Sequence, residues 1–234
     1  MRIKTVVVAF LLTIGFGLLN VTDASCQSVN GVTRYSGGSS TSLQAIIGIA
    51  ATDKVPMGII LGVKQTLCEP QRKFNFAGMS TLQALQKALE GTSYTVTLEQ
   101  GVYEVKAPDL TQREQEVLTF QFPKFGSTPT SMSGLGAWLT GYVLSVIEGG
   151  GGFAVDTLGS ANDEIIRIPE MKDLSAPQIA NEIVKLGSKG IWVMRATRCD
   201  SGPKPGSTLF EFYSYHDALP GLGKLTCPQT LACN

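Results

Sequence analysis

Apolar side chains recur at helical spacing in four segments of the chain. In each segment, positions i, i+3, i+4 and i+7 are mostly apolar and polar residues lie between them. Such a pattern is typical of an amphipathic helix whose apolar stripe must pack against another element. The predicted helices are "TSLQAIIGIAA" from Thr41, "STLQALQKALEG" from Ser80, "TSMSGLGAWLTGYVLSVIEGG" from Thr130 and "SAPQIANEIVKLGSKG" from Ser175.

Three of these helices begin with the same short motif. Thr41, Ser80 and Ser175 are each followed, three residues later, by a glutamine. This is a capping box, in which the hydroxyl accepts a backbone N–H in the first turn and the glutamine side chain reaches back to the cap. Pro177 falls in the first turn of the last helix, where its missing N–H costs nothing. The recurrence of the motif at matching places favours a repeated unit.

Alternation of apolar and polar residues predicts half-buried strands between the helices. The clearest case is residues 93–107, where Val96 and Leu98 alternate with polar residues before a turn at Glu99–Gly101 and a return strand. The other predicted strands, in chain order, are "MGIILGV", "RKFNFAG", "VLTFQFPKF", "FAVDTL", "EIIRIPEM", "GIWVMRATR" and "TLFEFYSYHD".

The element order β-α-β-β-α-β-β therefore occurs twice. This order predicts an α+β fold made of two tandem units, each with helices packed on small mixed sheets. We expect the first unit over residues 25–109 and the second over residues 110–225. The segment "APDLTQREQE", which starts at Ala107, is expected to be a polar linker between them, and residues 226–234 a C-terminal tail.

The first 24 residues have the pattern of a secretory signal peptide. Arg2 and Lys4 precede a mostly apolar run that ends near Leu19. The run is shorter than the ~20 residues that a membrane-spanning helix needs, and small residues follow it. We expect cleavage between Ala24 and Ser25, and a mature protein that is periplasmic or secreted.

A lipid anchor and a membrane span are not expected. Cys26 follows Ala24 and Ser25 as in a bacterial lipoprotein signal, but Asp23 stands where that signal has leucine. No later segment reaches membrane-spanning length.

Charge also limits the partners. The chain has 19 Lys and Arg against 19 Asp and Glu. A neutral chain without a basic patch lacks the electrostatic footprint of a nucleic-acid-binding protein.

The five cysteines of an exported chain suggest disulfide bonds. We expect Cys227 to pair with Cys233 across a short loop, which leaves Cys68 and Cys199 to link the two halves. No pair has CxxC spacing, so neither a redox centre nor a zinc site is favoured.

The residues that usually carry chemistry are scarce. His216 is the only histidine and lies at the end of a predicted strand. The glycines Gly149–Gly152 follow a predicted helix without a lysine, so they do not form a phosphate-binding loop. We expect no catalytic residue, no metal site and no cofactor. The aromatic strand near the C-terminus is the predicted interaction surface, with one face in the core and one on a partner: Phe210, Phe212, Tyr213 and Tyr215.

Residues 30–107 resemble the short N-terminal domain of secretins and TonB-dependent receptors, the STN domain. The segments that carry the resemblance are "TSLQAIIGIAATDKVPMGIIL" and "RKFNFAGMSTLQALQKALEGTSYTVTLEQGVYEVKA". The second half of the chain keeps the element order as a divergent copy. The resemblance implies two helices held between small sheets, a role in binding periplasmic proteins, and no catalytic residues to carry over.

Two functions follow as hypotheses. The first is a non-catalytic interaction module that binds an envelope protein, such as a receptor, a secretion channel or a regulator. The alternative is a small-molecule-binding protein or enzyme with a pocket between the two units.

Overall fold

The computed structural model describes residues 31–63, 67, 70–126, 130–147, 165–186, 190–201, 208–215 and 231–232. The signal peptide, the "FAVDTL" segment, His216 and the cysteines at 26, 68, 227 and 233 lie outside these residues. Within the described part of the chain, no helix has both the length and the apolar character that crossing a membrane requires.

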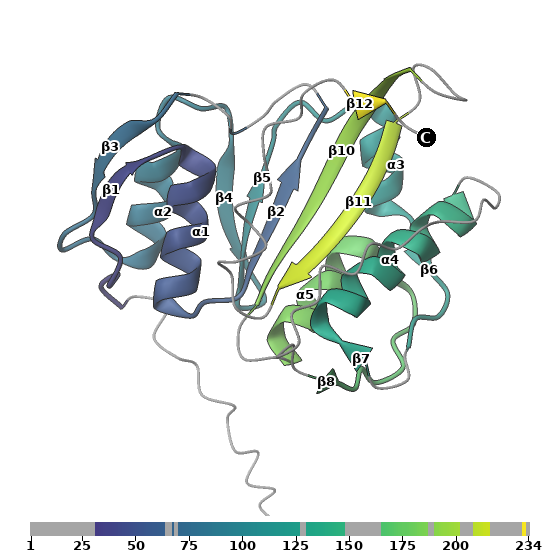
Figure 1. Ribbon diagram of the computed structural model, residues 1–234. Coiled ribbons are helices and arrows are strands. Elements are labelled where there is room, and N and C mark those ends of the chain that lie inside the picture. Colours follow the sequence, from purple (N-terminus) through teal and green to yellow (C-terminus); the bar gives the residue numbers. More distant parts are fainter. Residues whose placement is uncertain are drawn as a thin grey trace, which may run out of the picture.

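A single central sheet runs through the middle of the protein (Figure 1). Its strand order is β11–β10–β2–β5–β4, and β12 adds to β10 beyond this path. The middle strand β2 is parallel to both β5 and β10, whereas β4–β5 and β10–β11 are antiparallel hairpins. The strands are β2 (Met57–Leu61), β4 (Thr95–Glu99), β5 (Val102–Lys106), β10 (Ile191–Ser201), β11 (Thr208–Tyr215) and β12 (Leu231–Ala232).

Each half of the chain adds a helix pair and a short antiparallel ladder. Figure 1 shows α1 and α2 between the β1–β3 ladder and the central sheet, with α4 and α5 on the other side. The helices are α1 (Ser42–Asp53), α2 (Thr81–Leu89), α4 (Met132–Ile147) and α5 (Ala176–Leu186), which confirms the four predicted helices. The short strands are β1 (Gly37–Ser40), β3 (Arg72–Asn75), β6 (Gln121–Phe122), β7 (Thr130–Ser131), β8 (Ile165–Ile166) and β9 (Leu174–Ser175).

The two ladders follow the same plan. In the first half, β1 pairs with β3, and the bridge from Val32 to Ser80 extends the same register. In the second half, β7 pairs with β8 and β6 with β9, and the bridge from Phe125 to Met171 lies between them in one register. In the first half, the strand before α1 therefore pairs with the strand before α2. In the second half, the strands before α4 pair in the same way with the strands before α5.

The central sheet, in contrast to these ladders, is built from both halves of the chain. β2 from the first half pairs with β10 from the second over five residue pairs, from Met57–Ile191 to Leu61–Arg195. All five residues of β2 are buried, as expected for a central parallel strand covered on both faces. Each half thus keeps its short ladder but contributes its remaining strands to one shared sheet, and the α+β class is confirmed.

A missing side chain allows this seam to close. Gly58 of β2 lies directly opposite Trp192 of β10. A Cβ atom at Gly58 would lie 2.4 Å from two carbon atoms of the indole ring, so only glycine leaves room for the ring. The indole Nε1 donates a 2.6 Å hydrogen bond to Oδ1 of Asn181. The seam therefore also fixes α5 against the sheet.

The segment predicted as a linker is a helix, and part of a predicted strand is too. α3 (Gln112–Thr119) occupies most of "TQREQE" and the first residues of "VLTFQFPKF". It begins at a further capping box, Thr111 with Glu114, and buries Val117 and Leu118. The linker prediction was wrong because the apolar face of α3 consists of only Val117 and Leu118, which follow a run of polar residues.

Glu114 has a second role besides capping. Its side chain is fully buried. Oε1 accepts a 2.6 Å hydrogen bond from the backbone N–H of Val63, just after β2, and Oε2 accepts a 2.5 Å bond from the N–H of Thr111. One carboxylate thus joins the start of α3 to the end of the central strand.

Replacing this carboxylate tests the link. Glu114→Ala leaves two backbone N–H groups without their acceptor, and we expect the free energy of unfolding to fall by about 1–3 kcal/mol. Glu116→Ala is the matched control, because it removes only exposed contacts with Arg113 and Gln112 and should cost less than about 0.5 kcal/mol. Denaturant unfolding measures both, and equal losses in the two variants would contradict the link.

The C-terminal tail is likewise part of the fold. Leu231 and Ala232 form β12, which runs parallel to β10 opposite Cys199 and Ser201. The tail predicted for residues 226–234 therefore contributes backbone hydrogen bonds to the shared sheet.

Candidate interaction edge

Two of the four residues of the predicted aromatic surface lie in the core. Phe210 and Phe212 are 1% and 3% exposed and lie in the core, so these two residues are not on an interaction surface. Tyr213 and Tyr215 belong to β11, but their side chains lie outside the described structure. Of the disulfide candidates, only the backbone of Cys199 is described, in β10, so the two disulfides remain predictions.

The outer edge of β11 is closed by a side chain from α4. The backbone N–H of Phe212 donates a 2.7 Å hydrogen bond to Oγ1 of Thr140. The same hydroxyl lies 3.1 Å from the carbonyl oxygens of Phe212 and Gly136, between which it shares its single proton. One threonine thus satisfies both outward backbone groups of the middle of this edge strand, which prevents another strand from pairing there.

At the opposite edge of the sheet, no described strand pairs with the outer side of β4. The hairpin turn at Gln100 and Gly101 has φ of 50° and 82°, as in a two-residue type I′ turn. In such a hairpin, residues alternate between pairs that bond across the ladder and pairs whose groups point away. Tyr103 turns its N–H to the carbonyl of Pro56 at 3.0 Å, so its opposite neighbour Leu98 turns its own backbone groups outward.

Val96 is two residues from Leu98 and has the same orientation. Within the described residues, the backbone N–H and C=O groups of Val96 and Leu98 therefore form a short row without strand partners. The Leu98 side chain is 37% exposed, and that of Val96 is partly buried. β4 also contains neither lysine nor proline, the residues that commonly protect an edge strand.

The outer face beside this edge is polar. Thr97 of β4 pairs with Glu104 of β5. Burial raises the pKa of the Glu104 carboxyl, and the nearby Glu99 raises it further, while Lys106 opposes the shift. The charged groups near Glu104 therefore include both an acidic residue, Glu99, and a basic one, Lys106.

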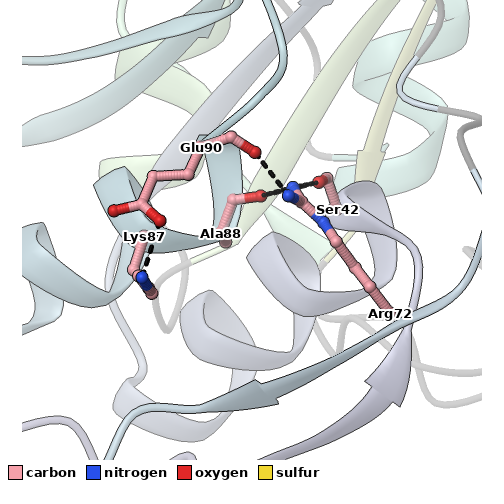
Figure 2. Close-up of polar contacts among 5 residues, drawn as sticks. All are labelled: Ser42, Arg72, Lys87, Ala88 and Glu90. Carbon is pink, nitrogen blue, oxygen red and sulfur yellow. Dashed lines mark hydrogen bonds and ion pairs between the residues drawn. The ribbon is translucent and has the colours of Figure 1, made fainter.

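Arg72 of β3 has a structural role. Nη2 of Arg72 donates to Oγ of Ser42 at 2.6 Å and to the carbonyl of Ala88 at 2.9 Å, and Nη1 donates to the carbonyl of Glu90 (Figure 2). These carbonyls end α2, where a positive charge is favourable. Lys87 and Glu90 form an exposed ion pair beside them. Arg72 thus links β3 to α1 and to the end of α2, and both of its Nη atoms donate within the protein.

No group of three or more His, Cys, Asp or Glu side chains that could hold a metal ion occurs among the described residues. A scan of the chain against models of protein families found no match, and searches of curated proteins and of solved structures found no similar protein.

The closed edge makes a sharp prediction. Thr140→Val keeps the side-chain shape but removes the hydroxyl, so the backbone groups of Phe212 lose their partner. We expect a loss of about 1–3 kcal/mol in the free energy of unfolding and faster hydrogen exchange at the Phe212 amide. Thr140→Ser retains the hydroxyl and should leave that amide protected. Identical exchange in both variants would show that the hydroxyl does not close the edge.

Proposed function

We propose that this chain is an exported, non-catalytic interaction module of the bacterial cell envelope, which binds an extended segment of a partner protein at β4. The observation that carries the proposal is the open row of backbone groups at Val96 and Leu98. An extended peptide can add to such an edge as a further strand, with backbone hydrogen bonds giving affinity and alternate side chains giving specificity. The resemblance of residues 30–107 to the STN domain supports the same class of function.

The contrast between the two edges of the sheet adds support. An edge strand that exposes an apolar side chain and contains neither lysine nor proline is a liability unless it has a use. Thr140 protects β11, whereas β4 keeps a 37% exposed leucine beside unpaired backbone groups. Among the residues that the structure describes, a side chain covers the edge at β11 and none covers the edge at β4.

A pocket between the two halves has less support. The halves meet at β2 and β10, which form a hydrogen-bonded ladder. Trp192 fills the space above Gly58 and bonds to Asn181. A seam filled in this way leaves little volume for a small molecule where the alternative hypothesis requires it.

The site of action in this proposal is the periplasm or the cell exterior. The observation that supports this location is the signal-peptide pattern of residues 1–24. N-terminal sequencing of the protein from expressing cells should begin at Ser25, and the protein should leave the envelope without detergent. A mature protein that begins at Met1 would remove the export part of the proposal.

Capture experiments test the edge itself. The tagged mature protein is cross-linked in its own envelope fraction and purified, in parallel with Val96→Pro and Val96→Thr. Proline removes the outward N–H without touching the β4–β5 ladder, while threonine keeps it. We expect a specific partner to be lost with Val96→Pro and retained with Val96→Thr. Equal recovery with both variants would rule out binding at this edge.

A further inference from the structure

The open edge of β4 is complementary to itself. An antiparallel partner strand must meet the outward groups of Val96 and Leu98 with outward groups of its own. A second copy of β4, related by a twofold axis at Thr97, places Val96 opposite Leu98 of that copy and Leu98 opposite its Val96. The axis lies at the middle residue of Thr95–Glu99, so the whole strand is paired and no residue overhangs.

The side chains agree with this register. Val96 and Leu98 lie on the same face of the sheet as Val105 and Tyr103, their ladder neighbours. Pairing about Thr97 extends this apolar row across the axis and covers the exposed Leu98 with Val96 of the second copy. Contacts between apolar side chains directly across a ladder are a main source of sheet stability.

Charge also fits. Glu99 lies opposite Thr95 of the second copy, and Thr97 lies opposite itself, so no two like charges face each other directly. Pairing centred on Glu99 would instead set two carboxylates against each other. The position of the single charged residue in β4 therefore disfavours that competing register.

We propose that β4 pairs with β4 of a second copy of this chain, antiparallel about Thr97, so that two molecules share one continuous sheet. This rests on the proposed function, because it names the occupant of the same edge. A contact built on one short strand is small beside the roughly 1,200–2,000 Å² of a stable interface. The dimer should therefore be weak and should form as concentration rises.

A cysteine on the axis gives a direct test. Thr97 faces Thr97 of the second copy in a pair without ladder hydrogen bonds, where Cα atoms are ~4.5 Å apart, within the range that a disulfide spans. Thr97→Cys should give a covalent dimer on mild oxidation, and peptide mapping should place the bond at position 97 in both chains. Thr95→Cys is the matched control on the same face. It should give at least about tenfold less, because residues at that position lie too far apart across the axis.

Hydrogen exchange supplies a readout without a substitution. As concentration rises, the amides of Val96 and Leu98 should gain protection. The Thr97 amide should not, because it already bonds to β5 within one molecule. Exchange at Val96 and Leu98 that does not depend on concentration, with no bond at position 97, would overturn the dimer.

The outcomes separate this inference from the proposed function. If Thr97→Cys forms no dimer but Val96→Pro still abolishes capture of another envelope protein, the self-pairing is wrong and the interaction module stands. If the position-97 dimer forms and capture recovers only copies of this chain, the self-pairing stands and the envelope partner is lost. If there is neither a dimer nor an effect of Val96→Pro, both fail.

Discussion

The parallel pairing of β2 with β10 is the contact on which the remaining architecture depends. It joins strands more than 130 residues apart in the sequence, at Met57–Ile191 and onward, so it forms only once both halves are in place. Gly58 admits the Trp192 ring at the centre of this contact, and the ring in turn holds Asn181 of α5. The helix pairs of the two halves are thereby fixed on opposite sides of one sheet, and relative motion of the halves would require breaking a buried ladder.

Capping joins the local structure to this seam. Thr41, Ser80 and Thr111 each accept a backbone N–H in the first turn of a helix, and the side chain three residues on bonds back to the cap. In α3 that side chain is the buried Glu114, which also binds Val63 at the end of β2. The capping box of α3 therefore does more than start a helix, because its glutamate also holds the start of α3 against the end of β2.

The two ends of the central sheet show how one fold treats its edges differently. At β11 the hydroxyl of Thr140 takes the place of a neighbouring strand. At β4 the turn at Gln100 and Gly101 ends a hairpin whose outer side has no such cover among the described residues. The charged and polar residues of the hairpin sit on the face rather than on the backbone edge. What distinguishes the β4 edge is therefore the backbone groups of Val96 and Leu98, which have no strand partner among the described residues, rather than its charge.

Local signals in the sequence determined the elements whose causes are local. The hydroxyl–glutamine spacing after Thr41 and Ser80 located two helix starts, and the Gln100–Gly101 turn located a hairpin, because caps and turns depend on residues within four positions of each other. The capping box of Thr111 and Glu114 is an equally local signal for α3, although the polar residues of that segment suggested a linker. Only the tertiary structure decided that the halves share a sheet and that the β11 edge is covered. Both depend on a partner far along the chain: Trp192 for Gly58, and Thr140 for the backbone of Phe212. An alternating pattern tells which side chains share a face, but it does not tell which strand lies alongside or whether an edge is covered.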